Sequence, residues 1–278
     1  MKKFSRVLFL NLILCFLLGC QKSDNGGTTT GNPVTVNMKI TASSQVASPA
    51  IVRNFHFLPN LFINKVFALA PPALQDSAGR AVTLSDFWMA LKTIEIRSTQ
   101  TSGGGETPDV KYVGPYAINM LGSNPPFFGS ILITPPVLRF KAVFQKLDFA
   151  APGAPAGMTN YAVYFAGQVN GQSFIVRSDE GITYEVAGPN PVSPPNNGIL
   201  LLSLKTANLF KRINLAAVTN GMTIDPTNRV AAANPCPTIN ASATDLYTCF
   251  KDGLHTEANF GHDRDSNDEL DATEATVK

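Results

Sequence analysis

The sequence contains few of the residues that carry catalysis or bind transition metals. It has three histidines, four cysteines and one tryptophan in 278 residues. No nucleophile elbow, HExxH motif or phosphate-binding glycine loop is present, and neither His255 nor His262 stands at a zinc-binding spacing from the cysteines. These absences exclude the recognisable classes of hydrolase, nucleotide-binding protein and zinc protein. We therefore expect a protein that is not an enzyme.

A long apolar run is also missing, because a membrane-spanning helix needs ~20 such residues. The run at residues 7–18, interrupted by Asn11, follows a short basic start and suits an export signal covering residues 1–19. It ends in Leu17-Leu18-Gly19-Cys20, which resembles the lipobox of bacterial lipoproteins. The resemblance implies cleavage before Cys20, a diacylglycerol on its thiol, and stable attachment to a lipid bilayer. The alternative is a plain secretory peptide with an incidental cysteine.

An excess of positive charge is absent from the mature chain. Removing residues 1–19 takes away three basic residues and no acid, so the formal net charge falls from +2 to −1. We therefore expect no nucleic-acid partner. The negative charge is concentrated in residues 252–278, where eight acids stand beside two basic residues. A solvated acidic tail would have this composition, but the spacing of its oxygen-bearing residues favours a metal site.

The remaining cysteines indicate an oxidising compartment. Cys15 lies in the signal segment and Cys20 at the lipidation site, which leaves Cys236 and Cys249 as an even pair. In a bacterial envelope such a pair is expected to form a disulfide. The closed loop would stabilise the fold by ~3 kcal/mol in the chain-entropy model. Two independent buried thiols are the alternative.

Residues 34–205 have the pattern of a β domain, preceded by a polar tether at residues 20–33 that spans ~20 Å root-mean-square. Short segments of strand-forming residues alternate with Gly- and Pro-rich connections. The Asn170-Gly171 pair predicts a two-residue type I′ hairpin turn. We expect an antiparallel β-sandwich, immunoglobulin- or transthyretin-like, with strands near residues 34–40, 88–96, 112–121, 138–149, 161–169, 172–177, 182–186 and 199–204.

Residues 206–278 form a C-terminal segment of different character. Residues 206–215 are either a short helix or an irregular connection. Asp245 is a candidate N-cap for a helix over residues 246–260, which Gly253 would weaken by ~1 kcal/mol. This helix would lead into the acidic loop, and residues 270–278 would form a very short exit helix.

Residues 263–274 have the spacing of an EF-hand calcium loop. Side-chain oxygens occupy positions 1, 3, 5, 9 and 12, and position 8 is an aliphatic residue. Calcium prefers six to eight oxygen ligands, chiefly carboxylates and carbonyls. The expected ligands are Asp263, Asp265 and Asn267 through one oxygen each, Glu269 through its backbone carbonyl, Asp271 directly or through water, and Glu274 through both carboxylate oxygens.

The loop departs from the EF-hand pattern at Asp268, which stands where glycine is usual. That position needs a left-handed backbone, which aspartate adopts at a modest cost. A single loop with a short exit helix predicts weak binding, with a Kd on the order of 10⁻⁴–10⁻³ M. We therefore expect a structural calcium ion that fixes the C-terminus. An acidic disordered tail is the alternative.

Several short motifs resemble a group of uncharacterised bacterial envelope lipoproteins with a sandwich fold. They are the lipobox, Thr30-Gly31-Asn32-Pro33 after the cysteine, and the segments at residues 112–121 and 169–172. The resemblance implies a location in the cell envelope and a fold class, and no activity. Gln21 stands in place of the aspartate associated with inner-membrane retention, which favours the outer membrane.

These features predict a lipid-anchored envelope protein with a structural calcium-binding loop and a binding or structural role. The main alternative is an adhesin-like or carbohydrate-binding module that presents Tyr161, Tyr164 and Tyr184 to a surface glycan or protein partner. Packing of these tyrosines in the core is the competing interpretation. A further alternative is a hydrolase built on His56 and scattered acids.

Overall fold

A computed structural model describes residues 32–43, 74–97, 110–121, 127–151 and 153–266, together with Leu270, Glu274, Thr276 and Val277. The expected signal peptide, Cys20, His56 and nearly all of the tether lie outside these described residues. The described part belongs to one compact unit, Gly31–Lys278. None of the helices described within it is long and apolar enough to cross a bilayer.

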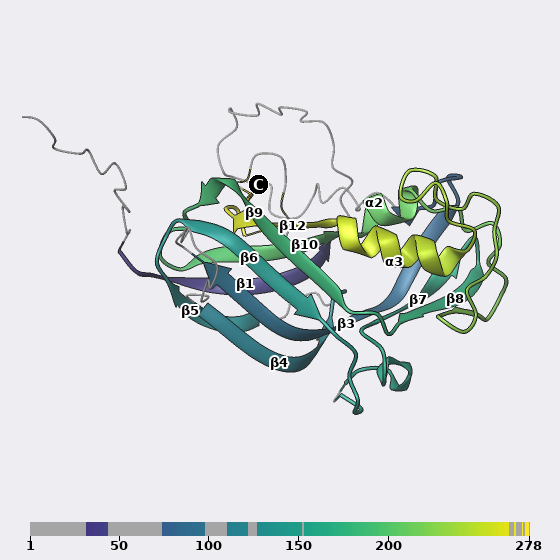
Figure 1. Cartoon of the computed structure of the whole chain (residues 1–278), viewed down its shortest axis with the longest axis horizontal. Coiled ribbons are helices and arrows are strands. Elements are labelled where there is room, and N and C mark those ends of the chain that lie inside the picture. The colour runs from purple at the N-terminus through teal and green to yellow at the C-terminus, as the bar shows by residue number, and fades with distance from the viewer. Residues whose placement is uncertain are drawn as a thin grey trace, which may run out of the picture. The chain divides into compact units, whose positions relative to one another are not determined.

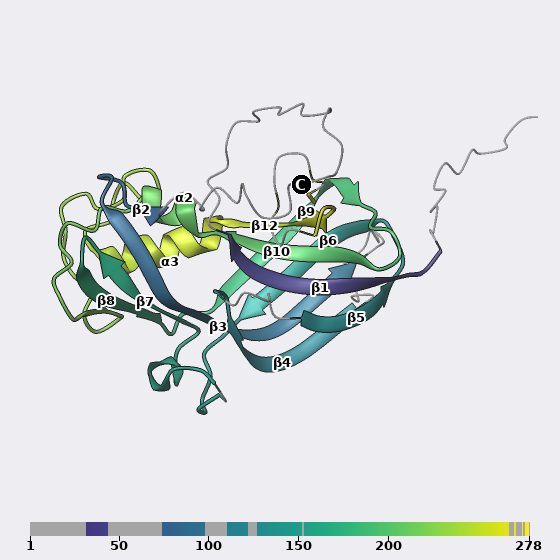
Figure 2. The same cartoon turned by 180° about the vertical axis from the view of Figure 1, so that it is seen from behind.

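Two β-sheets make up most of this unit (Figures 1 and 2). The four-stranded sheet has the order β12-β10-β1-β5, formed by Ala258–Asp263, Gly198–Lys205, Val34–Ser43 and Phe127–Ile133. The larger sheet has the order β11-β8-β7-β3-β6-β9, formed by Met222–Ile224, Gln172–Ser178, Val163–Val169, Ala81–Arg97, Val137–Phe144 and Ile182–Val192. Strands β2 (Leu74–Gln75) and β4 (Val110–Asn119) also pair with β3.

The predicted mainly β, sandwich-like fold is confirmed. Most pairings between the described strands are antiparallel, but β1 pairs with β10 and β8 pairs with β11 in parallel. A parallel pair needs a long crossover connection, and between β1 and β10 the described chain forms most of the second sheet as well as β5 of the first. Strands from the beginning and from the end of the described chain thus lie in the same small sheet.

Strand β3 is shared by two regions of the larger sheet. Its first half, Val82–Met89, pairs with β7, and its second half, Leu91–Arg97, pairs with β6. The β6 region faces the small sheet, where Phe140 stacks on Phe260 of β12 with ring centroids 3.9 Å apart. The β7 region faces two helices instead, and both the strands and the helices contribute to one hydrophobic core.

Those helices are α2 (Thr206–Lys211) and α3 (Leu246–Thr256). Phe165 of β7 lies edge-on to Phe210 of α2 and Phe250 of α3, with centroids 6.1 and 5.0 Å away. Gly253 allows the helices to approach, because a Cβ there would stand 2.4 Å from Leu209 Cδ1. The glycine that weakens the helix in isolation is thus required by its packing.

The predicted hairpin turn is confirmed between β7 and β8. Val169 pairs with Gln172, and the two residues between them have positive φ, 48° at Asn170 and 80° at Gly171. Both central residues of a type I′ turn need this backbone.

Asp245 caps α3 as the sequence predicted, accepting a hydrogen bond from the Thr248 backbone N–H at 2.7 Å. The expected extension of the helix to Phe260 is wrong, because α3 ends at Thr256 and Ala258–Asp263 forms β12. Pairing with the edge of β10, together with burial of Phe260, outweighs the weak helical period. The disulfide is confirmed: Cys236 is joined to Cys249 of α3, with Cα atoms 5.8 Å apart.

Candidate metal centre

The acidic loop starts from the last residue of β12 and returns to the same strand. Asp263 pairs with Ile199 of β10. After the loop, Thr276 forms an antiparallel bridge with Gly261, and the Val277 N–H donates to the Phe260 carbonyl at 3.0 Å. The expected exit helix is therefore wrong at Thr276, and the loop is closed by strand pairing. An EF-hand loop is flanked by helices, so this loop has the ligand spacing without those helices.

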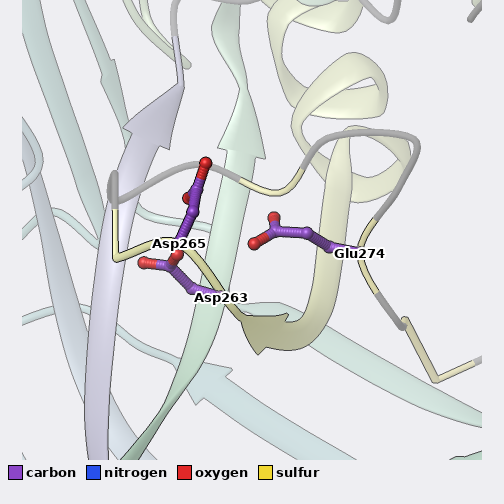
Figure 3. A group of neighbouring side chains, drawn as sticks. All are labelled: Asp263, Asp265 and Glu274. Carbon is purple, nitrogen blue, oxygen red and sulfur yellow. The ribbon is translucent and has the colours of Figure 1, made fainter. Parts of the chain in front are cut away.

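Three carboxylates from the loop converge (Figure 3). One oxygen from each of Asp263, Asp265 and Glu274 lies within 4.8 Å of the others. Asp263 is 1% and Glu274 8% exposed, whereas Asp265 is exposed. In Figure 3 the Glu274 carboxylate points across the loop toward the two aspartates. Two ligands of one calcium ion, each ~2.4 Å from it, stand at most ~4.8 Å apart. The donor set fits a hard, oxygen-preferring cation.

Backbone and side-chain donors hold the loop in this shape. The Arg264 N–H donates to Glu274 Oε1 at 2.5 Å, which joins loop positions 2 and 12. Lys205 Nζ donates to the Leu270 carbonyl at 2.6 Å, and both residues are buried. Lys205 closes β10, so this bond fixes the middle of the loop to the small sheet. Lys205 was not among the predicted site residues, although a lysine at the end of an apolar strand is a signal that could have identified it.

The imidazole next to the cluster does not offset its negative charge. Burial, with a smaller contribution from Arg264, lowers the pKa of His262 below its ordinary value, although Asp263 opposes the shift. His262 is therefore neutral at pH 7. A neutral histidine adds no positive charge beside the carboxylates.

Half of the predicted ligand set can be placed. Asp263, Asp265 and Glu274 come together, at loop positions 1, 3 and 12. Leu270, the aliphatic residue expected at position 8, is buried at 4% exposure. The other predicted ligands, Asn267, Glu269 and Asp271, lie outside the described residues, as does Asp268.

Two further buried acids, Asp76 and Asp225, were not predicted from the sequence. Asp76 accepts hydrogen bonds from the Arg80 side chain and from the backbone N–H of Leu215. Asp225 accepts from Thr227 Oγ1 at 2.6 Å and from Arg177 at 2.6 Å. The Asp225-Pro-Thr-Asn sequence is a turn signature that could have identified the second site. Each carboxylate is matched to an arginine of the same chain.

A shallow groove of about 400 Å³ lies on the outer face of β3, β7 and β8. Thr83, Ser85, Gln168 and Ser173 line it together with glycines and apolar residues that include Phe174, and none of its lining residues is an acid, a base or a histidine. The Ser173 hydroxyl donates a hydrogen bond to Asn220 Oδ1 at 2.8 Å. The lining can form hydrogen bonds but offers no group for proton transfer.

Two of the three tyrosines proposed as a ligand face, Tyr164 and Tyr184, are packing residues, as the competing interpretation predicts, whereas Tyr161 is half-buried. Tyr164 is 8% and Tyr184 3% exposed, and the Tyr184 hydroxyl donates to the Leu254 carbonyl at 2.5 Å. Burial raises the pKa of the Tyr184 phenol far above its ordinary range. The guanidinium carbon of Arg177 lies 4.8 Å from the centroid of the Tyr161 ring.

Comparison of the chain with family models, curated proteins and solved structures finds no match in any of the three. The functional argument therefore depends on the residues of the site itself.

Proposed function

We propose that this protein is a lipid-anchored component of the bacterial envelope whose C-terminal loop binds calcium in a structural role. One observation carries the calcium proposal. Carboxylates that stand at positions 1, 3 and 12 of an EF-hand spacing approach within 4.8 Å of one another in the fold. Their convergence supports the metal-binding interpretation over that of a solvated acidic tail.

The chain's own residues prepare this site. The edge of β10 positions Asp263, the Arg264 N–H orients Glu274, and Lys205 holds the middle of the loop. Calcium, when bound, would offset the mutual repulsion of the carboxylates and lock the C-terminus onto β12. Asn267, Glu269 and Asp271 would complete the ligand set.

The envelope location is supported by two independent features. The lipobox at Leu17–Cys20 predicts export and acylation of Cys20, with the outer membrane favoured by Gln21. The Cys236–Cys249 disulfide is typical of an oxidising compartment. A binding or structural role, without catalysis, is the function that these features support best.

Calorimetric titration of calcium into the protein tests the proposal. Wild-type protein is expected to bind one ion with a Kd on the order of 10⁻⁴–10⁻³ M. Glu274→Gln removes the charge of the position-12 ligand and is expected to abolish binding. Glu180→Gln is the matched control, because the Glu180 side chain is 48% exposed and lies outside the loop. Equal binding by both variants would refute the site.

A glycan-binding role is the second candidate, and the groove on β3, β7 and β8 is the observation that favours it. Its hydroxyl and amide groups suit neutral polyhydroxylated ligands. Ala166→Trp would fill the groove, because Ala166 lines its floor. A glycan array that shows binding by wild-type protein and none by the variant would support this role, and silence from a folded wild-type sample would remove it.

A further inference from the structure

The groove on β3, β7 and β8 has a carboxylate at its border. Directly paired residues of neighbouring strands point to the same side of a sheet. Two rows of paired residues cross the groove, one of Thr83, Gln168 and Ser173 and one of Asp86, Ala166 and Ile175. All of these residues except Asp86 line the groove. The side chain of Asp86 therefore lies on the groove face, beside the floor residue Ala166.

A β-bulge in β3 gives the groove this acid. Ser85 is the extra residue at a register shift in the pairing of β3 with β7. In a bulge, two residues of one strand stand opposite a single residue of the partner strand. The next residue, Phe87, is 1% exposed and faces the core, so Asp86 faces outward. The Ser85 hydroxyl and the Asp86 carboxylate thus both lie next to Ala166.

Asp86 differs from the other acids of the fold in having no cationic partner. It is half-buried, and its carboxylate forms no ion pair or hydrogen bond within the described residues. Every other buried or half-buried acid described outside the C-terminal loop pairs with a lysine or arginine: Asp76, Glu95, Asp225, Asp245, Asp252 and Glu257. Asp86 is therefore the one such carboxylate whose charge the described chain leaves without a salt bridge.

The next row on the same face does not supply the missing cation. That row consists of Trp88, Tyr164 and Arg177. Arg177 pairs with Asp225 at 2.6 Å. Burial raises the pKa of Tyr164, and the charge of Asp86 raises it further, so this charge acts on the neighbouring row. A partly desolvated carboxylate gains a charge-assisted hydrogen bond when a ligand brings its own cation.

The other groups of the groove indicate which kind of cation fits. Thr83, Ser85 and Gln168 offer hydroxyl and amide groups that both donate and accept hydrogen bonds. Ala166 and Ile175 add apolar surface. A sugar ring has hydroxyl groups at its edge and C–H groups on its face, and it matches this combination. A lysine side chain has only methylene groups and one ammonium, so it would leave the polar lining unmatched.

The size of the groove is also compatible with a sugar. Its volume of about 400 Å³ lies within the ~300–1,000 Å³ of typical small-ligand sites. We infer that the groove binds an oligosaccharide that carries amino groups, with a protonated amine of the sugar donating to the Asp86 carboxylate. The inference rests on the glycan-binding role given above as the second candidate function. It adds the chemical class of the ligand and the residue that selects it.

A matched series of ligands tests the inference by calorimetry at pH 6. The three ligands are β-1,4-linked tetrasaccharides of glucosamine, N-acetylglucosamine and glucose, which differ only in an amine, an acetamide or a hydroxyl at carbon 2. We expect the wild-type protein to bind the glucosamine oligomer about tenfold or more tightly than the other two. Added salt should reduce this preference, because it screens the pairing of the amine with the carboxylate.

A pair of variants assigns the preference to one residue. Asp86→Asn keeps the shape of the side chain and removes its charge, so it is expected to bind the glucosamine and glucose oligomers equally. Asp179→Asn is the matched control, because Asp179 is exposed in the turn between β8 and β9 and does not line the groove. It should keep the wild-type preference. A thermal melt checks that both variants fold, and the ligand series with the wild-type protein decides the question if Asp86→Asn does not.

The contrary outcomes separate the inference from the functions on which it rests. Equal affinity of wild-type protein for the three oligomers would overturn the inference and leave the glycan-binding role intact. Binding of none of them by a folded sample would remove both. Trilysine that binds as tightly as the glucosamine oligomer would overturn it in favour of a cationic peptide. A calcium melt of the same sample reports the metal site separately.

Discussion

Buried carboxylates occur in two arrangements in this molecule. Asp76 stands opposite the Arg80 guanidinium and accepts backbone hydrogen bonds from Ala78, Arg80 and Leu215. Burial alone would raise the pKa of Asp76, but these donors outweigh it and hold the pKa below its ordinary value. The C-terminal loop instead brings Asp263, Asp265 and Glu274 toward one another. Asp76 is thus a single carboxylate that faces an arginine, whereas the loop brings three carboxylates close together.

The difference indicates where an external cation is expected to act. The negative charge of a carboxylate that pairs with an arginine is offset by the protein itself, so its contribution to stability does not depend on added calcium. Converging carboxylates repel one another, and a divalent cation turns that repulsion into a crosslink. Region 74–80 is therefore expected to be indifferent to calcium, and region 263–274 to depend on it.

Asp76→Ala breaks the first arrangement and has the largest expected effect. It leaves Arg80 and the Leu215 N–H without their buried acceptor and separates β2 from the segment after α2. Loss of one partner of such a pair costs about 3–5 kcal/mol. Urea denaturation would measure the loss, with and without calcium. A loss that calcium restores would contradict the separation of the two regions.

The C-terminal segment contains a region closed by the disulfide and a separate loop that is expected to bind the metal. Removal of the disulfide tests whether the two are independent. The double variant Cys236→Ala, Cys249→Ala is expected to lower the free energy of unfolding by about 3 kcal/mol. Its calcium affinity should remain that of the wild type, because β12 and the loop lie outside the closed segment. Calorimetry on the variant that found no calcium binding would show that the two parts form one cooperative site.

Calcium is expected to stabilise the wild-type protein by less than either of these changes. For a Kd on the order of 10⁻⁴–10⁻³ M, 10 mM calcium adds about 1.4–2.7 kcal/mol to the free energy of unfolding. Thermal melts would record it as a higher Tm. Glu274→Gln should melt at one temperature with and without the ion, whereas Asp225→Asn should keep the calcium response. An identical response from both variants would place the ion elsewhere.

The pH dependence of stability gives the smallest effect. Hydrogen bonds from Thr227, Asn228 and Arg177 outweigh burial and lower the pKa of Asp225 below its ordinary value. The carboxylate therefore stabilises the fold above about pH 4, and this contribution is lost as the pH falls through the lowered folded-state pKa. Asp225→Asn should cost about 1 kcal/mol at pH 6 and progressively less below pH 3. Urea denaturation at both pH values would show a constant difference if the carboxylate is not ionised in the fold.

Local sequence patterns predicted the fold class, but they did not predict how the strands pair. Alternating residues identified most strands, and Asn170-Gly171 fixed the two-residue hairpin turn between β7 and β8. The first three residues of β12, Ala258–Phe260, were predicted as the end of a helix, because the periodicity there is ambiguous. Only the edge of β10, far away in sequence, determines that it is a strand. The parallel pairing of β1 with β10 has the same origin, since no local signal specifies a crossover.

The candidate site was predicted to a similar degree. Ligand spacing along a short loop is a local property, and it identified three carboxylates that do converge. The flanking elements and the Lys205 contact depend on tertiary packing, so the sequence placed helices where the chain forms a strand and a bridge. Asp76 and Arg80 are close in sequence, but the third donor to the carboxylate, the Leu215 N–H, comes from a residue far away in sequence.

The most direct test of the calcium site is the anomalous difference density of crystals grown with calcium. The account predicts one peak, ~2.3–2.6 Å from carboxylate oxygens of Asp263, Asp265 and Glu274. Soaking the crystals in a chelator should remove it. Well-ordered carboxylates around the same point without a peak, or a peak bound only by other residues, would contradict the central claim that this loop is a metal site.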